Sequence, residues 1–180
     1  YLRFVRVLRP KSLMLENVPG LFKDARFLQF RKTVESMGYQ VNADVLDAAS
    51  YGVPQRRRRL IFLASLGGRI DFSPKARAIR TVRQAFALLS AKSASKDALH
   101  NLPENRSTRV SELIRRIPKD GGSRSQAGAK YQLDCHTRCD GFSDVYGRMS
   151  WDKVAPTITS GCFNPSKGRF LHPSKDRAIT

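Results

Sequence analysis

The stretch that decides the fold is YGVPQRRRR at residues 51–59, which leads directly into the apolar segment LIFLA at residues 60–64. A run of arginines usually marks a solvated surface turn, but the apolar segment after it predicts a buried strand. Successive side chains of a strand point to opposite faces, so we expect Arg57 and Arg59 to share one side. Two guanidinium groups on one face would form a fork for a phosphate or a planar base. A solubilising turn is the alternative interpretation.

The residues before this stretch alternate between helix and strand patterns. The spacing of apolar residues predicts one helix within residues 1–10 and another over residues 24–38. A short apolar run at 13–15 and a strict apolar–polar alternation at 39–45 predict two strands. With the strand at 60–65, the order is helix, strand, helix, strand, strand, which is typical of an α/β sheet.

The carboxyl end of the first predicted strand carries Glu16. In open α/β sheets, ligands bind in the crevice beyond the carboxyl ends of the strands, so this carboxyl group is a candidate for proton donation or hydrogen bonding to a substrate. The simpler interpretation is an acid at a strand end that caps the following turn. The residue alone does not decide between the two.

After residue 68 the sequence becomes polar, basic and rich in Ser and Gly up to about residue 140. We predict helices over 81–90 and 107–117 within it, and a separate small lobe whose fold the sequence leaves open. The basic turn that ends at Arg124 is interpreted either as a binding loop or as a flexible connection. A more patterned stretch returns at about residue 145.

The charge of the chain restricts its partners. Lys and Arg number 33 against 15 Asp and Glu, which gives a formal net charge of +18 over 180 residues. Such an imbalance predicts a polyanionic partner, most simply nucleic acid. No apolar stretch is long enough to span a membrane, and no basic amphipathic helix favours a membrane surface, so we expect no membrane partner.

The cysteines predict a reducing compartment and no metal. The chain has three cysteines, Cys135, Cys139 and Cys162, an odd number whose spacing indicates no disulfide framework. Cys135, His136 and Cys139 provide too few ligands for a structural zinc site, which usually needs four. The chain begins at Tyr1 rather than Met, and we expect it to be part of something longer.

Several motifs, taken in order, resemble those of the DNA (cytosine-5)-methyltransferases. They are Glu-Asn-Val-Pro-Gly at 16–20, Tyr-Gly-Val-Pro-Gln-Arg-Arg-Arg-Arg at 51–59, Tyr-Gly-Arg at 146–148 with Trp151, and Pro-Thr-Ile-Thr at 156–159. Residues 168–173 and 177–180 resemble the approach to the last block of that family. The resemblance covers nearly the whole chain.

The resemblance implies base flipping and methyl transfer from S-adenosylmethionine to carbon 5 of cytosine in double-stranded DNA. By resemblance, Glu16 bonds to N3 and reads the exocyclic amine, Arg59 holds the base through O2, and Arg57 steadies the site. The remaining residues expected to contact substrate or DNA are Asn17, Gln55, Arg124, Arg148, Thr157 and Thr159. Arg148, Thr157 and Thr159 are also expected to link the recognition lobe to the catalytic domain.

The same resemblance indicates what is missing. The nucleophile of the family lies in a Pro-Cys pair upstream of the Glu-Asn-Val motif, but no cysteine precedes Glu16 here. The Phe-x-Gly-x-Gly loop that binds the cofactor is also absent. We therefore expect the main S-adenosylmethionine pocket to lie outside this chain, no metal, and a chain that is inactive by itself.

The expected fold is α/β, namely the back half of a Rossmann-like S-adenosylmethionine-dependent methyltransferase sheet with a small, loop-rich target-recognition region. We expect a partial catalytic domain at 1–68, the recognition region at 69–143, and a return segment at 144–180. The expected setting is the prokaryotic cytoplasm, in association with the nucleoid, with restriction–modification as the biological context.

Two other functions remain open. The chain is alternatively a non-catalytic DNA-binding subunit or remnant, with a second chain carrying the nucleophile. A third hypothesis replaces DNA by transfer RNA, since one branch of the same family methylates that substrate. Glu16 and Arg59 favour catalytic ancestry, because binding alone needs neither residue.

Overall fold

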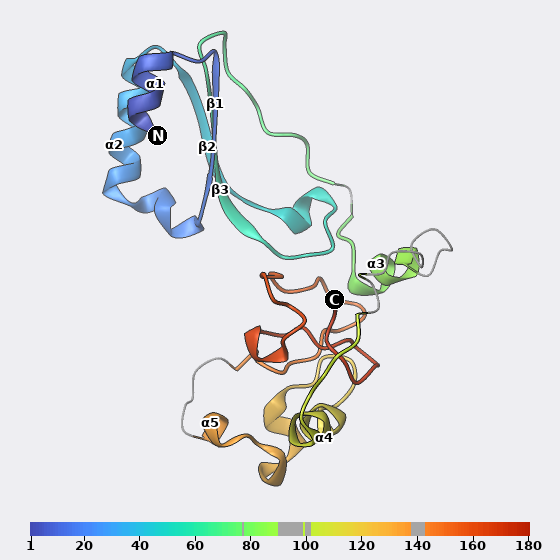
Figure 1. The fold of residues 1–180 in the computed structure, drawn as a ribbon. Coiled ribbons are helices and arrows are strands. Elements are labelled where there is room, and N and C mark those ends of the chain that lie inside the picture. The colour runs from blue at the N-terminus through green and yellow to red at the C-terminus, as the bar shows by residue number, and fades with distance from the viewer. Residues whose placement is uncertain (77, 90–98, 100–101, 138–142) are drawn as a thin grey trace. The chain divides into compact units, whose positions relative to one another are not determined.

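The computed structural model describes residues 1–76, 78–89, 99, 102–137 and 143–180. The chain divides into two compact units, each of which is described by itself (Figure 1). Unit 1 consists of Tyr1–Gly52 and Arg57–Ala78, and unit 2 consists of Val53–Arg56 and Ile79–Thr180. The short segment 53–56, which carries part of the arginine-rich motif, therefore packs with residues far away in the sequence.

Unit 1 is built on a three-stranded antiparallel sheet. Its strands are β1 (Ser12–Asn17), β2 (Gln40–Asp47) and β3 (Arg58–Ser65), in the order β1-β3-β2. The apolar run after the arginines is thus the central strand, and every second residue from Leu60 to Ala64 is buried. All three predicted strands are confirmed, and the α/β class with them.

Two helices lie on one face of this sheet, α1 (Leu2–Leu8) and α2 (Ala25–Ser36) (Figure 1). Both were predicted from apolar spacing. Asp24 caps α2, because its carboxylate accepts a hydrogen bond of 2.8 Å from the Arg26 N–H. The helices and the sheet share one apolar core, which contains Val5, Leu13, Phe27, Val34, Tyr39, Leu60, Phe62 and Ala64.

Unit 2 has little regular structure. Its helices are α3 (Val82–Leu89), α4 (Thr108–Arg116) and α5 (Asp134–Thr137). The helices predicted at 81–90 and 107–117 are confirmed within the described residues, although Ser90 lies outside them. Short 3-10 turns complete the two units, namely η1 (Pro19–Lys23), η2 (Ala48–Tyr51), η5 (Arg124–Ala127), η6 (Ala129–Tyr131) and η7 (Pro165–Lys167).

The largest core of unit 2 packs α4 against the end of the chain. Leu113, Ile114 and Ile117 lie in it together with Leu171 and Ala178, and all five are buried. A smaller cluster joins Val82, Met149 and Ala155, with Phe86 and Trp151 at its side. Segments from both ends of unit 2 therefore hold its irregular loops in place.

Among the described residues, no helix combines the length and apolar character needed to cross a membrane. The described His, Cys, Asp and Glu side chains likewise form no group of three or more that could hold a metal ion. Cys135 and Cys162 carry free thiols. Cys139, the third member of the predicted cysteine set, lies outside the described residues.

Candidate active site

Glu16 and Arg59 meet on neighbouring strands of unit 1. The register of β1 against β3 places Glu16 opposite Ile61, so Arg59 is its diagonal neighbour on the same face. The Arg59 Nε lies 2.8 Å from the Glu16 Oε1. Arg59 Nη1 also donates to its neighbour, the Arg58 carbonyl, at 2.8 Å. These contacts orient the guanidinium group while 49% of the Glu16 side chain stays exposed.

The turn after Glu16 is fixed locally. Asn17, the last residue of β1, accepts a hydrogen bond of 2.8 Å at its side-chain Oδ1 from the Val18 N–H. Pro19 then starts the η1 turn. The side chain of Asn17 thus shapes the strand end that carries Glu16.

Arg57 stands immediately before β3, and its backbone is held by Asp47. The Arg57 N–H donates to the Asp47 Oδ1 at 3.0 Å, and the Arg57 carbonyl accepts from the Ala48 N–H at 3.1 Å. Arg57 stands two residues before Arg59, which pairs with Glu16. Because side chains alternate along a strand, Arg57 is therefore in register with the Glu16 face. Sequence reasoning missed Asp47, although an acid between a strand and a small-residue turn is a typical capping signal.

Within unit 2, the motif around Gln55 pairs with the Pro-Thr-Ile-Thr motif. Gln55 forms a parallel bridge with Ala155, and the Arg56 N–H donates to the Ala155 carbonyl at 2.8 Å. The Gln55 Oε1 accepts from the Ile158 N–H at 3.3 Å, and the Thr157 hydroxyl donates to the Arg56 carbonyl at 2.8 Å. Two motifs that lie about a hundred residues apart in the sequence therefore form one hydrogen-bonded strip.

Two other residues that were predicted to contact DNA, Thr159 and Arg124, lie outside this strip. Thr159 is exposed just beyond it. Arg124 starts the η5 turn and is half-buried. The loop before Arg124 is packed: the Gly122 carbonyl accepts from the Arg148 N–H at 2.9 Å, and a Cβ at Gly122 would lie 2.2 Å from the Pro118 carbonyl oxygen.

Arg148 occupies a different environment from the one expected, because its side chain is fully buried. Its guanidinium group donates to the carbonyl oxygens of Ile114 (2.7 Å) and Ile117 (3.0 Å) at the end of α4. It also bonds to the His172 and Lys175 carbonyls and to the Asp176 carboxylate. The expectation that Arg148 touches DNA therefore needs correction: buried among these acceptors, Arg148 offers no surface to a phosphate and serves as an internal clamp.

His172 packs beside this clamp, between aromatic rings. Its ring stacks on Phe86 with centroids 5.1 Å apart and meets Trp151 edge-on. The His172 Nδ1 accepts hydrogen bonds from the N–H groups of Ser174 and Lys175, so this nitrogen carries no proton. Burial, together with the nearby positive charges, lowers the pKa of His172 to about 4.

Arg169 is a second arginine that binds several backbone carbonyl groups, and sequence reasoning did not assign it. Its guanidinium group donates to the Gly121, Gly122 and Arg148 carbonyls and to the Ser123 hydroxyl, at 2.8–3.1 Å. A Cβ at Gly147 would lie within 2.7–2.9 Å of this side chain. The glycine of the Tyr-Gly-Arg motif is thus explained by the close approach of an arginine.

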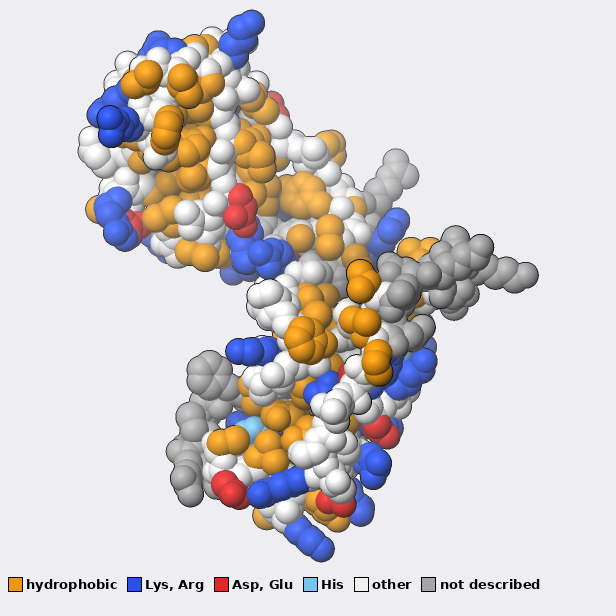
Figure 2. All heavy atoms as spheres, viewed as in Figure 1, with side chains coloured by type: hydrophobic (Ala, Val, Ile, Leu, Met, Phe, Trp, Pro, Cys, Tyr) orange, Lys and Arg blue, Asp and Glu red, His pale blue; other side chains and the backbone are white. Residues whose placement is uncertain are grey.

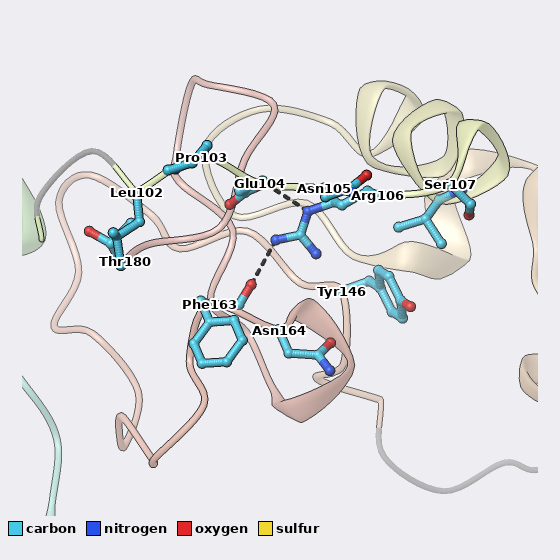
Figure 3. Close-up of a pocket in the computed structure, with 11 residues that line it drawn as sticks. Leu102, Pro103, Glu104, Asn105, Arg106, Ser107, Tyr146, Phe163, Asn164 and Thr180 are labelled. Carbon is cyan, nitrogen blue, oxygen red and sulfur yellow. Dashed lines mark hydrogen bonds and ion pairs between the residues drawn. The ribbon is translucent and has the colours of Figure 1, made fainter.

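Unit 2 also contains a cavity of about 510 Å³ (Figure 3). On its wall, Arg106 lies between the Glu104 carboxylate (2.6 Å) and the Phe163 carbonyl (2.7 Å). Glu104 accepts a further bond from the Ala178 N–H at 2.8 Å. None of the residues predicted for the site lines this cavity, which is formed by Leu102, Pro103, Glu104, Asn105, Arg106, Ser107, Val110, Tyr146, Phe163, Asn164 and Thr180.

Comparison with known proteins now identifies the family. The family model described as C-5 cytosine-specific DNA methylase matches residues 1–180. The chain belongs to this family. It is 33% identical over 190 residues to the Type II methylase M.HgiDII of Herpetosiphon aurantiacus, a match that covers 99% of this chain and 53% of that protein.

A second relative gives the same picture. The chain is 30% identical over 195 residues to the Type II methyltransferase M1.BsuMI of Bacillus subtilis strain 168, covering 99% of this chain and 42% of that protein. The chain thus spans about half the length of the curated DNA methylases it matches.

One solved structure supports the fold. It is an E. coli prophage-encoded protein named as a DNA modification methyltransferase, and it superposes with a TM-score of 0.55. The sequences are 18% identical, and the match covers 98% of this chain and 58% of the other. The α/β fold of this chain therefore matches part of the fold of that protein.

Proposed function

We propose that this chain is the base-holding and DNA-recognition portion of an enzyme that transfers a methyl group from S-adenosylmethionine to carbon 5 of cytosine in DNA. The observation that carries the proposal is the 2.8 Å ion pair between Arg59 and Glu16, which joins two family motifs on adjacent strands. The Type II names of the relatives favour a restriction–modification setting.

The proposed roles follow from the chemistry of these side chains. Carbon 5 of cytosine is a poor nucleophile, and it becomes reactive when a thiolate adds to carbon 6. A proton or a strong hydrogen bond at N3 assists that addition, and we assign this to Glu16. Arg59 holds O2 of the base, and its ion pair keeps Glu16 at the strand end. Arg57 steadies the same edge of β3.

The cytosine must leave the helix to reach Glu16, so base flipping is part of the proposal. Its cost is offset by phosphate contacts, which the net charge of +18 favours. We place Gln55 and Thr157, on the hydrogen-bonded strip of unit 2, and Thr159, just beyond it, near the DNA backbone. Asn17 shapes the turn beside Glu16, and Arg124 stays a proposed DNA contact.

For the complete enzyme, we propose that residues 1–68 form the back half of a Rossmann-like sheet. Residues 69–143 are the proposed target-recognition region and 144–180 the return segment. Hydrophobic side chains gather on the visible surface of unit 1 (Figure 2). Phe4 and Val7 on α1 and Met14 on β1 are among its exposed hydrophobic residues. An apolar surface beside the sheet edge β1 is expected where further strands and helices pack.

The nucleophile and the main cofactor pocket are proposed to lie outside these 180 residues. S-adenosylmethionine, when bound, supplies the electrophilic methyl group. Glu104, the one carboxylate side chain among the described residues that line the cavity of Figure 3, is already engaged by Arg106 and the Ala178 N–H, so we do not place the cofactor there. The comparisons do not support a separate chain for the nucleophile, since the matched relatives are themselves about twice as long.

The test is Glu16→Gln in the complete protein that carries this chain. We expect methylation to fall by at least about 100-fold while DNA affinity stays largely unchanged, because general acid–base groups typically contribute about 10²–10⁴-fold. Glu35→Gln is a matched control, since Glu35 forms an ion pair of the same length with Arg31 on α2. Loss of DNA binding with Glu16→Gln, or unchanged methylation, would contradict the catalytic assignment.

The substrate is tested separately. Methyl transfer to duplex DNA is measured in the presence of increasing transfer RNA, and the reverse experiment uses labelled transfer RNA with competing duplex. We expect methylated DNA and weak competition by RNA. Methylation of transfer RNA with duplex DNA as a poor competitor would support the RNA hypothesis instead.

A further inference from the structure

Two positively charged side chains of unit 2 lie over the ring of Tyr131. The guanidinium carbon of Arg116, the last residue of α4, is 4.8 Å from the ring centroid, and the ammonium nitrogen of Lys130 is 6.0 Å from it. Lys130 and Tyr131 belong to the η6 turn. Both cations are exposed, whereas Tyr131 is half-buried and packs against the core that contains α4. The ring therefore gathers cations from two segments at one fixed place, which we call the Tyr131 platform.

Within the part of the chain that the structure describes, no carboxylate compensates these two charges. Arg109, on the same helix, pairs with Asp134 at 2.7 Å, but Arg116 and Lys130 take part in none of the ion pairs there. Glu112, one turn before Arg116 on α4, forms no ion pair with it. Like charges that are held close together repel each other, so an anion bound at this place would be stabilised by both cations.

A simpler explanation accounts for only part of the platform. Cations in the last turn of a helix interact favourably with its dipole, which explains Arg116. Lys130 lies outside the helix, and its distance of 6.0 Å from the ring is at the limit of an effective cation–π contact. An anionic partner explains both cations together.

We propose that the Tyr131 platform binds phosphate groups of duplex DNA. The inference rests on the proposed function, in which the chain acts on DNA, and it adds a phosphate contact in unit 2 to the base-holding Glu16 and Arg59 of unit 1. Arg, Lys and Tyr are among the side chains that bind phosphate oxygens in protein–DNA interfaces, where they fix the position of the duplex without reading its sequence. The net charge of +18 favours such a long polyanion over an acidic peptide.

The test is the salt dependence of DNA binding by the complete protein that carries this chain. The probe is a short, fluorescently labelled duplex of mixed sequence, and anisotropy measures its affinity. We expect Arg116→Gln and Lys130→Gln each to weaken binding by about 3- to 10-fold at about 0.1 M salt. Each lost phosphate contact lowers the slope of log K against log salt by about 0.9, so the double variant should lower it by about 2.

Arg109→Gln is the matched control, because it removes the same charge from an exposed position of α4 whose partner is Asp134. We expect its affinity to stay within about twofold of the wild type and its slope to be unchanged. Arg116→Lys keeps the charge and should keep the slope. Circular dichroism checks that each variant is folded, and Lys130→Gln, outside the helix, tests the platform even where Arg116→Gln disturbs α4.

The outcomes separate the inference from the function on which it rests. If the wild type binds the duplex and the double variant binds it with the same affinity and slope, the platform is wrong, and a partner such as an acidic protein would have to supply the anion. A loss seen with one duplex but not with a second of unrelated sequence also overturns the phosphate assignment, because it indicates base readout. A wild-type protein that binds no duplex DNA refutes the proposed function and the inference with it.

Discussion

Units 1 and 2 are ordered by different interactions. In unit 1, strand ladders and one apolar core account for the fold, and ion pairs such as Arg31–Glu35 lie on the surface. In unit 2, buried Arg148 binds backbone carbonyls at the end of α4 and in the loop after His172. Where regular hydrogen bonding is scarce, the side chain of a buried arginine thus donates to backbone carbonyl groups.

This difference predicts opposite sensitivities to the loss of an arginine. Unit 1 should tolerate removal of its surface charges, since solvent screens them. Unit 2 should be destabilised when Arg148 is lost, because several carbonyl oxygens would lose the same donor together.

The largest effect is expected for Arg148→Met in unit 2. The change removes a donor shared by four backbone carbonyl oxygens and by the Asp176 carboxylate, which keeps its contact with Lys119, so we expect the free energy of unfolding of the 180-residue chain to fall by about 3–5 kcal/mol. Denaturant titration followed by the fluorescence of Trp151 measures it, because Trp151 is the single tryptophan of the chain and lies in unit 2. Arg109→Met on α4 is the control, expected within about 0.5 kcal/mol because its ion pair is exposed. An equal loss of stability in Arg148→Met and Arg109→Met would contradict the special role of the buried arginine.

A second effect is expected from pH. The pKa of His172 is lowered to about 4 in the folded chain, so the unfolded chain binds a proton first as the pH falls. The stability from neutral His172 is fully present above about pH 6.5 and is lost progressively towards pH 4. The loss is on the order of 3 kcal/mol, since one pKa unit corresponds to about 1.4 kcal/mol.

Denaturant titrations of the chain at a series of pH values measure this dependence through Trp151 fluorescence. His172→Asn, which cannot titrate in this range, should flatten the profile between pH 6.5 and 4. An unchanged slope in that variant would assign the pH dependence to other groups.

The smallest effect is expected for Glu35→Gln in unit 1. The Glu35 and Arg31 side chains are about 40% exposed, and they form an i,i+4 pair on α2 at 2.8 Å. Removing the charge should change the free energy of unfolding by no more than about 0.5 kcal/mol. Far-UV circular dichroism in urea checks this, and a loss of several kcal/mol would mean that unit 1 also depends on its ion pairs.

Unit 1 could be predicted from the sequence because its signals are local. Apolar periodicity located α1, α2 and all three strands. The family resemblance placed Glu16 and Arg59 at the same base, and the register of β1 against β3 brings the two side chains together. Their catalytic roles stay predictions.

In unit 2 the sequence located α3 and α4, but it did not predict which polar side chains are buried or what they contact. Arg148 in a basic chain is indistinguishable from an arginine that contacts DNA, because burial and acceptor geometry leave no periodic trace in the sequence. Arg169 and the cavity beside Arg106 were missed for the same reason. The acceptors of Arg148 and Arg169 lie in segments that are distant in the sequence.

By itself, the sequence determined the family, the positive charge and the helices and strands of unit 1, since these follow from local pattern and composition. Only the tertiary structure decided which polar side chains face inward. It paired Gln55 with Ile158, buried Arg148 and turned Asp47 towards Arg57. Such contacts depend on where a folded chain places its unsatisfied backbone groups, and a linear pattern does not carry that information.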